Sequence, residues 1–271
     1  TFFDRTNYFQ TVPRNALDTA LWLESDRMGH FKGSITQAKL DEQRGVVQNE
    51  KRQGDNEPYG KVFEMILKQL FPPDHPYSWE AIGSMEDLNA ASLDDVRHWF
   101  ETWYGPNNAV IVIAGDVDSD EAFAKAEKYF GDIAPGPAAT RLEEWIPIHA
   151  QPRRQQMQDR VAQARLYMAW TGPRWGTRDA HQLELAAAVL AGDKNSRLYQ
   201  RLVYKDQLAS DIEFGPLALE IAGITYLQAS AQPGVSLAQI ESAITEELER
   251  FRREGPTAKE LERVQAQQRA A

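Results

Sequence analysis

The domain organisation follows from one short stretch, which reads Ala134-Pro135-Gly136-Pro137-Ala138-Ala139-Thr140. Proline and glycine interrupt regular secondary structure, so this composition is typical of a linker. Patterns that favour helices and strands precede the stretch and begin again after it. The sequence therefore predicts an α+β protein with two successive domains, the first at residues 1–140 and the second at residues 141–271.

Before the linker, two segments favour strands. Residues 1–13 read as a strand, and Ala109-Val110-Ile111-Val112-Ile113-Ala114 is a continuous apolar run typical of a strand buried in a sheet. Apolar spacing and terminal residues predict the helices between them. We expect helices at 15–29, from residue 36 through residue 50, at 61–71, at 92–103 and at 122–130, with a loop or broken helix at 53–60.

Two of these helices carry more specific predictions. Asn15 with Asp18, and Ser92 with Asp95, resemble capping boxes at helix starts. The helix after Ser92 also has a stripe of large apolar side chains, which at this spacing indicates a position in the core. The stripe consists of Val96, Trp99, Phe100 and Trp103.

After the linker, strands and helices alternate again. Residues 165–170 and 224–231 favour strands, and residues 178–190, 196–204 and 237–251 favour helices. A last helix is expected to begin after Thr257, which forms a capping box with Glu260.

Composition excludes several classes of site and partner. The 271 residues have a net charge of -10, so the chain as a whole does not attract nucleic acid or an anionic membrane. Cysteine is absent, which excludes disulfides, thiolate metal sites and cysteine nucleophiles. No apolar run approaches the roughly 18 residues that a membrane span requires. Because the chain opens on Thr1 without Met and closes in a helical pattern without a stop signal, we expect an internal piece of a longer protein.

One carboxylate stands out. Leu40, Gln43, Val47 and Glu50 lie three or four residues apart, so they share one face of a helix that is partly apolar. A carboxylate buried on such a face needs a cation, hydrogen bonds or a metal. Glu50 is therefore a candidate metal ligand; a partly exposed helix edge, or an ion pair with Arg44 or Arg52, would also explain it.

The histidines provide no complete site. None of the five lies three or four residues from another, so no helix presents a histidine pair to zinc. His75 lies in a proline-rich loop, where a structural role in a turn is the simpler interpretation. Phosphate-binding loops and serine-nucleophile motifs are also missing. The residues alone thus indicate an α+β protein with one unexplained glutamate.

Several short motifs, in this order and spacing, resemble the insulinase/pitrilysin family of zinc peptidases. The resemblance extends over nearly the whole chain. Its motifs are Asp4-Arg5-Thr6-Asn7-Tyr8-Phe9, Arg44-Gly45-Val46-Val47-Gln48-Asn49-Glu50, His75-Pro76-Tyr77-Ser78, Trp103-Tyr104-Gly105-Pro106-Asn107-Asn108-Ala109, Ala114-Gly115-Asp116, Ser196-Arg197-Leu198-Tyr199 and Gly255-Pro256-Thr257.

The resemblance implies a fold and a metal site. The family fold consists of tandem α/β sandwich domains, each a mostly antiparallel sheet packed with helices. Members bind Zn2+ through His-x-x-Glu-His and a later glutamate, whose position Glu50 matches. The His-x-x-Glu-His segment is expected roughly 25 to 30 residues before Thr1, so no catalytic residue is expected within the chain, and the chain by itself is expected to be inactive. Gln43 stands where many members have an acid that orients the ligand.

The resemblance also implies substrate and partners. The family hydrolyses extended peptides or unfolded protein segments, which pair with a sheet edge that Thr1, Phe2 and Phe3 would flank. Many members carry a substrate-binding Arg and Tyr at the positions of Val203 and Ser210, so we expect a second family-like half or subunit to supply that pair. The alternative is a non-catalytic partner or scaffold subunit of the same family. Related bacterial enzymes are often exported, which favours the periplasm.

Overall fold

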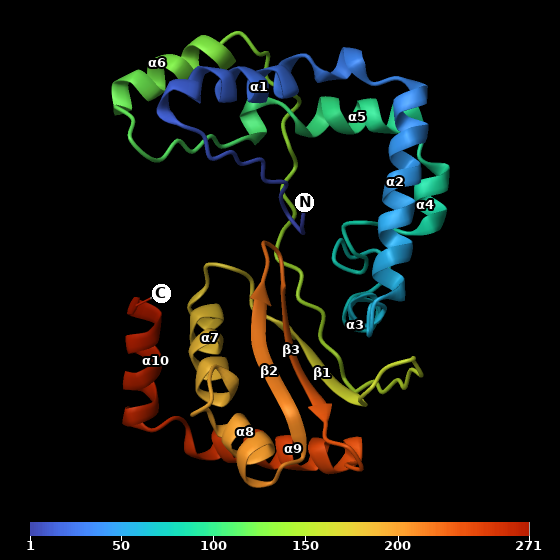
Figure 1. Cartoon of the computed structure of the whole chain (residues 1–271), viewed down its shortest axis with the longest axis vertical. Helices are drawn as coiled ribbons and strands as arrows, with labels where there is room; N and C mark the ends of the chain where they lie inside the picture. Colours follow the sequence, from blue (N-terminus) through green and yellow to red (C-terminus); the bar gives the residue numbers. More distant parts are fainter. Residues whose placement is uncertain (271) are drawn as a thin grey trace. The chain divides into compact units, whose positions relative to one another are not determined.

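The computed structural model describes residues 1–270, which form two units (Figure 1). Unit 1 contains Thr1–Asp55 and Ala81–Arg141, and unit 2 contains Asn56–Glu80 and the chain from Leu142 onward. The segment 56–80 thus belongs to the same unit as residues that follow it by more than sixty positions. The domain limits 1–140 and 141–271 stay a prediction about independent folding.

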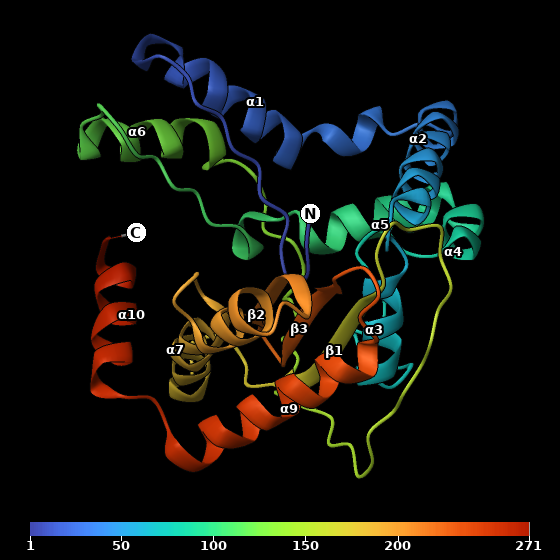
Figure 2. The ribbon, with the colours of Figure 1, turned by 60° about the horizontal axis from the view of Figure 1, so that its bottom comes forward.

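Unit 1 is built of helices. They are α1 (Leu17–Gly29), α2 (Gln37–Asn56), α4 (Met85–Ala90), α5 (Leu93–Trp103) and α6 (Ser119–Phe130), with short 3-10 turns at Arg14–Ala16, Phe31–Ser34 and Pro106–Asn108. Helices α1 and α6 lie side by side (Figures 1 and 2).

A polar cluster joins α1 to α6. Asp18 of α1 accepts hydrogen bonds from the Lys125 ammonium and, at 2.8 Å, from the Tyr129 hydroxyl, both on α6. These hydrogen bonds lower the pKa of Asp18 to about 2. The Asp18 side chain thus bonds to α6 and does not cap its own helix. The predicted capping box with Asn15 is wrong, and α1 begins after Ala16 without a side-chain cap.

The two strands predicted before the linker, at residues 1–13 and at Ala109–Ala114, are both wrong. The amide of Phe2 donates to the carbonyl of Arg5 at 3.1 Å, and Asp4 has a φ of 64°, so the chain turns at its start instead of extending. Ala109–Ala114 is not hydrogen-bonded to a neighbouring strand. A strand forms only with a partner, and the described residues of unit 1 contain no other strand to pair with it.

Helix α5 confirms one prediction and contradicts another. The Ser92–Asp95 capping box is present, with each side chain bonded to the backbone of the other residue. The apolar stripe, in contrast, does not lie in a core, since Trp99 is 61% exposed and no residue of α5 is fully buried.

Unit 2 contains the sheet. Strands β1 (Arg165–Gly172), β2 (Ala209–Ala218) and β3 (Gly223–Ala231) are antiparallel in the order β1-β3-β2. β1 and β3 confirm the sequence prediction. The sequence patterns do not predict β2, because Gly215 and Pro216 interrupt it and Glu213 is exposed. The mixed helix and antiparallel-sheet architecture agrees with the predicted α+β class.

Helices cover this sheet and enclose its core. They are α3 (Val62–Leu70), α7 (Arg178–Ala191), α8 (Arg197–Tyr199) with a π-helical turn at Gln200–Lys205, and α9 (Leu237–Glu254). A further helix, α10 (Ala258–Ala270), packs against α7. Leu198, Leu202, Leu227, Ile240 and Ile244 have no exposed surface and form the centre of the core. None of the helices formed by residues 1–270 combines the length and apolar composition needed to cross a bilayer.

Polar contacts attach α10 to the rest of unit 2. The Arg197 guanidinium donates to both carboxylate oxygens of Glu260 at 2.7 Å, and Arg263 pairs with Asp193. The bonds from Arg197 lower the pKa of Glu260 to about 2. Thr257 and Glu260 also form the predicted capping box.

Candidate functional site

The predicted ligand Glu50 lies on α2, which is continuous from Gln37 to Asn56. The loop predicted at 53–60 therefore begins only after Asn56. Leu40 and Val47 are partly buried on the same face, whereas Gln43 and Glu50 are exposed. Glu50 is thus at the surface of the described residues, and the assumption that its carboxylate is buried is wrong.

Another face of α2 binds α4. Arg44 donates through Nε to the carbonyl of Leu88 at 2.9 Å and through Nη2 to the carbonyl of Ala91 at 2.5 Å. These carbonyls belong to the C-terminal end of α4, where helix oxygens lack partners within the helix and attract cations. Asp41 accepts from Nη1 of Arg44 at 2.6 Å and so orients the guanidinium.

The arginine contacts contradict one explanation of Glu50. Arg44 donates its hydrogen bonds to Asp41 and to carbonyls at the end of α4, and Arg52 donates to the side-chain oxygen of Asn49 at 2.8 Å. An ion pair between Glu50 and either arginine is therefore wrong. Within residues 1–270 the Glu50 carboxylate has neither a hydrogen-bond nor an ion-pair partner.

The described residues do not contain a complete metal site. Among residues 1–270, no three His, Asp or Glu side chains are grouped so that they could hold a metal ion. Glu50 belongs to no such group, and Gln43 lies two turns before it on the same face. Their roles as ligand and orienting residue stay predictions.

The first three residues are held by local contacts. The hydroxyls of Thr1 and Thr6 are 3.1 Å apart, and the rings of Phe2 and Phe3 pack edge to face. Phe2 is 49% exposed, whereas Phe3 is buried. A role of Thr1, Phe2 and Phe3 in flanking a substrate cleft stays a prediction.

The two positions at which the resemblance implies a substrate-binding Arg and Tyr, Val203 and Ser210, lie in unit 2. Val203, in the π-helical turn, packs against the core, and Ser210, in β2, donates to the Asp211 carboxylate at 3.1 Å. Neither side chain offers the cation or the phenol of the family pair.

His75 has the structural role that its loop predicts. The ring is fully buried between Phe71 and Trp145, with ring centres 4.4 and 4.5 Å away. Nδ1 accepts from the amide of Tyr77 at 3.0 Å, so Nε2 carries the proton and donates to the carbonyl of Trp145 at 2.9 Å. Burial lowers the pKa of His75.

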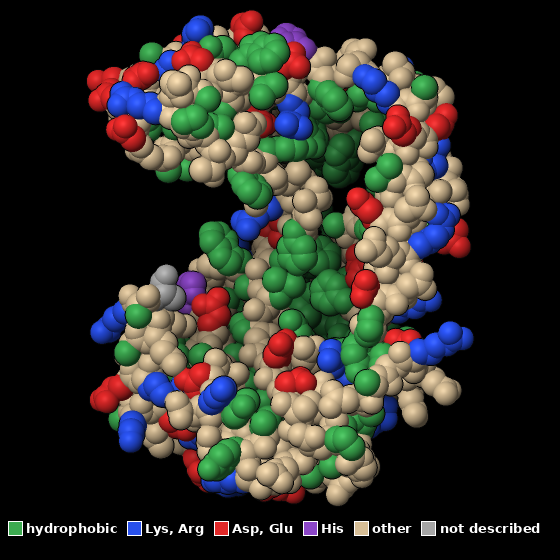
Figure 3. Space-filling view, viewed as in Figure 1, with side chains coloured by type: hydrophobic (Ala, Val, Ile, Leu, Met, Phe, Trp, Pro, Cys, Tyr) green, Lys and Arg blue, Asp and Glu red, His purple; other side chains and the backbone are tan. Residues whose placement is uncertain are grey.

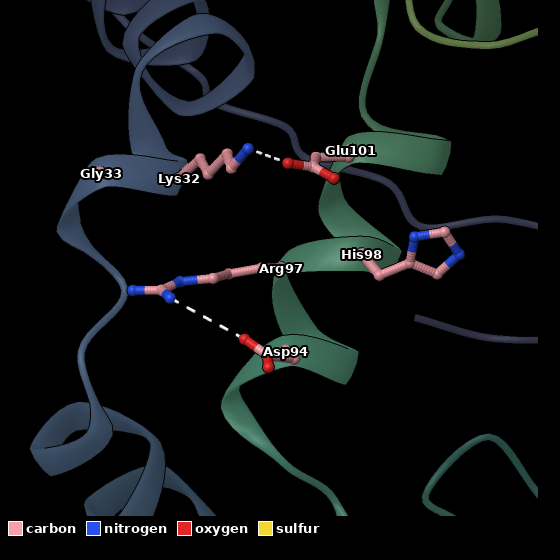
Figure 4. Close-up of a pocket in the computed structure, with 6 residues that line it drawn as sticks. All are labelled: Lys32, Gly33, Asp94, Arg97, His98 and Glu101. Carbon is pink, nitrogen blue, oxygen red and sulfur yellow. Dashed lines mark ion pairs between the residues drawn. The ribbon is translucent and has the colours of Figure 1, made fainter.

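Unit 1 also has a surface pocket of about 520 Å³, which the sequence patterns do not predict. Its charges are largely paired: Lys32 with Glu101, and Arg97 with Asp94 at 4.0 Å (Figure 4). The ring of His98 points away from these pairs. Because each carboxylate faces its own cation, neither is a free oxygen ligand for a metal.

Comparison with known proteins places these features in a family. Residues 90–268 match the model of the peptidase M16 inactive domain. The zinc protease PqqE of Helicobacter pylori is 26% identical over 280 residues, which cover 100% of this chain and 61% of PqqE.

Two solved structures share the fold. The peptidase M16 inactive domain from Pseudomonas fluorescens has a TM-score of 0.81 at 19% identity, covering 95% of this chain and 61% of that chain. The first half of the periplasmic protease PqqL from Escherichia coli has a TM-score of 0.69 at 19% identity, covering 96% of this chain and 56% of that chain.

The chain thus spans less than two thirds of each of these relatives. The family match covers more than half of the chain and confirms the resemblance drawn from its motifs. This chain belongs to the peptidase M16 family.

Proposed function

We propose that this chain is part of a zinc metalloendopeptidase that hydrolyses extended peptides or unfolded protein segments. The observation that carries the proposal is Glu50, an exposed carboxylate with no partner within residues 1–270. The resemblance of the motif Arg44–Glu50 to the family implies a zinc ligand at this residue. Membership of the M16 family and similarity to a protein described as a zinc protease support the same reaction class.

The residues present fit part of a zinc site. Glu50 would provide one oxygen ligand, and Gln43 would orient it through a hydrogen bond. Two histidine ligands and the general base would come from a His-x-x-Glu-His helix encoded before Thr1. Zinc, when bound, lowers the pKa of a water molecule and polarises the scissile carbonyl. One carboxylate does not replace three ligands, so the chain by itself is expected to be inactive.

Substrate and location follow from the same proposal. Peptides would add to a sheet edge near Thr1, Phe2 and Phe3, and a second family-like half would supply the Arg and Tyr that Val203 and Ser210 replace. The similar protein PqqL is described as periplasmic, which supports a periplasmic location.

A second candidate is a non-catalytic partner or scaffold subunit. The matching family model is described as an inactive domain, and Glu50 lies outside the matched residues 90–268. This candidate would leave Glu50 with no metal to bind.

The test begins with the roughly 40 codons that precede Thr1 in the gene, where the zinc proposal requires His-x-x-Glu-His. In the protein that includes them, Glu50→Gln is expected to lower bound zinc and cleavage of a fluorogenic peptide at least tenfold, on the order of the losses that follow damage to a metal site. Glu42→Gln is the matched control, an exposed glutamate on the same helix. Another sequence in place of the motif would favour the non-catalytic subunit, whereas unchanged zinc content in Glu50→Gln would show that Glu50 is not a zinc ligand.

A further inference from the structure

One face of the unit 2 sheet is polar where β1 begins. Side chains alternate along a strand, so Leu166 and Met168 pack against the core, whereas Arg165 and Tyr167 lie on the opposite face. The strand register places Ser230 of β3 directly beside Arg165. Three polar side chains from two neighbouring strands therefore meet on this face.

The Arg165 guanidinium is held from three directions. Its Nε donates to Oγ of Ser230 at 2.8 Å, and its Nη1 donates to the hydroxyl of Tyr167 at 3.3 Å. Its Cζ lies 3.9 Å from the centre of the Tyr59 ring, which attracts the cation through its π face. Tyr59 is itself fixed, because its hydroxyl donates to the carbonyl of Gln163 at 2.7 Å. A cation held in this way has little conformational freedom left to lose when a ligand binds.

Arg165 is partly buried, yet no carboxylate within residues 1–270 forms an ion pair with it. A guanidinium has five N–H donors, and Ser230 and Tyr167 accept one each. Nη2 makes no hydrogen bond to the described residues and is not among their buried unpartnered atoms, so it is in contact with solvent. Arg197, in contrast, is neutralised by both oxygens of Glu260. Arg165 therefore presents an unneutralised cation whose remaining donors are accessible.

Tyr167 adds a second donor beside Arg165. Its oxygen accepts from Nη1, and its own proton finds no acceptor in the part of the chain that the structure describes. Burial raises the pKa of the Tyr167 hydroxyl, so that proton stays in place at neutral pH. Asp211 lies on the same face, but its carboxylate accepts from Ser210 at 3.1 Å. The donors of Arg165 and Tyr167 are thus available to an external acceptor.

The Arg165 cation is isolated and does not belong to a broad basic surface. Basic and acidic side chains are interspersed over the visible surface of unit 2 (Figure 3). A polyanion such as nucleic acid, which needs many cations along its backbone, therefore gains little here. A single carboxylate fits better, because parallel N–H groups of a guanidinium match its two oxygens.

We propose that Arg165 and Tyr167 bind the carboxylate group of a peptide, which is either its C-terminus or an acidic side chain. Unused N–H groups of Arg165 would donate to the carboxylate oxygens, and the Tyr167 hydroxyl would donate to one of them. Carboxylate binding follows from the geometry of unit 2 alone, whereas its assignment to peptides rests on the proposed function. These positions differ from Val203 and Ser210, where the family resemblance implies a substrate-binding pair that this chain lacks.

Isothermal titration calorimetry of the full chain, with a chelator present, tests the site without zinc chemistry. The probe is the peptide Ac-Ala-Val-Thr-Ala with a free C-terminus, compared with its C-terminal amide. The free acid is expected to bind roughly tenfold more tightly, because only the acid forms charge-assisted bonds with Arg165. A further amidated peptide has Glu in place of Thr. Binding of either acidic peptide supports the site, and the tighter one identifies the source of the carboxylate.

Matched variants separate recognition from folding. Arg165→Met keeps an apolar stem against Tyr59 and is expected to remove the preference for the acid, whereas Tyr167→Phe is expected to weaken it about threefold. Arg165→Lys keeps the charge without the planar fork and is expected to retain the preference only in part. Arg154→Met is the control, since Arg154 is exposed and paired with Glu241, and it is expected to bind like the parent. The urea midpoint of each variant checks that the sheet is intact, and Arg165→Lys with Tyr167→Phe provides the test if Arg165→Met does not fold.

Three results would overturn the inference. Equal affinities for the acidic and amidated peptides would show that no carboxylate is recognised. A preference for the acid that is unchanged in both Arg165→Lys and Tyr167→Phe would place its binding elsewhere. Displacement of the peptide by an equal concentration of sulfate would indicate a general anion site. Failure of the zinc proposal would leave these titrations unchanged, and failure of these titrations would leave the zinc content of Glu50→Gln unchanged.

Discussion

At the scale of single residues, His75 shows how one ring holds a loop together. Its two nitrogens bond to the amide of Tyr77 and the carbonyl of Trp145, and Tyr77 in turn accepts from the amide of Ile221 at 3.2 Å. Only the neutral ring satisfies both bonds, because a protonated Nδ1 would face another donor. His75 and Tyr77 together therefore join the loop at 72–78 to the chain after the linker and to the turn between β2 and β3.

The lowered pKa of His75 predicts a pH dependence of unfolding. The unfolded state takes up a proton near pH 6.5, whereas the folded state does so only at lower pH. The free energy of unfolding should therefore be constant above about pH 7 and fall as the pH drops below about 6.5. His75→Gln should reduce that dependence and lower stability by about 1–3 kcal/mol, because a buried group loses its partner. Urea unfolding from pH 5 to 8 measures both effects, with exposed His98→Gln as the control. An identical pH slope in His75→Gln and the parent would contradict the prediction.

The exposure of Glu50 is a feature that the sequence did not predict. The motif around Glu50 located a candidate ligand through family resemblance, but its exposure depends on how α2 packs against α4. That packing rests on Arg44, whose bonds reach carbonyls more than forty positions away. Local spacing does not encode such distant partners.

At the scale of elements, prediction succeeded where a pattern found its partner within the chain. β1 pairs with β3, α9 packs against both strands, and α7 contributes Leu190 to the same core; each was predicted from its periodicity. Ala109–Ala114 has the same local preference but no partner, so propensity alone did not make it a strand. β2 shows the reverse, because pairing with β3 and contact with α7 override Gly215 and Pro216.

Helix α10 should respond to acid through Glu260. The carboxylate has a pKa of about 2 in the folded protein against 4.5 without its partners, so its stabilising effect is complete above pH 4.5 and lost between about 4.5 and 2. Glu260→Gln should loosen α10 already at pH 7, by about 1–3 kcal/mol, because Arg197 then stays buried with its charge unpaired. Faster amide exchange confined to α10 would show this, with exposed Glu262→Gln as the control. Equal exchange in both variants would mean that Val264 and Arg263 hold the helix without Glu260.

At the scale of the whole molecule, unit 2 depends on a segment that lies before the linker. α3 and the loop after it contribute Leu67, Phe71 and Tyr77 to the buried set, and α3 contacts β1. The buried side chains of unit 2 therefore come from two separate parts of the chain. Sequence patterns predicted α3 as a helix but did not predict that it packs in unit 2, because contacts between distant segments are not encoded in a local pattern.

A protein that starts at Leu142 should therefore be less stable than one that starts at Asn56. Without α3, one side of β1 loses its apolar cover, and the loss of several buried side chains at about 1.5–3 kcal/mol each exceeds the stability of many domains. The midpoint of urea unfolding, followed by tryptophan fluorescence, should fall markedly or the transition should lose its cooperativity. Equal midpoints for the two proteins would show that α3 is dispensable.

The edge strand β2 also affects how well the purified protein resists aggregation during storage. Pro216 has no amide hydrogen, and the exposed Glu213 carries a negative charge, so a strand from a neighbouring molecule finds both a missing donor and repulsion along this edge. Concentrated stocks should therefore resist fibril growth from β2, and Pro216→Val with Glu213→Val is the pair of changes that would shorten their shelf life.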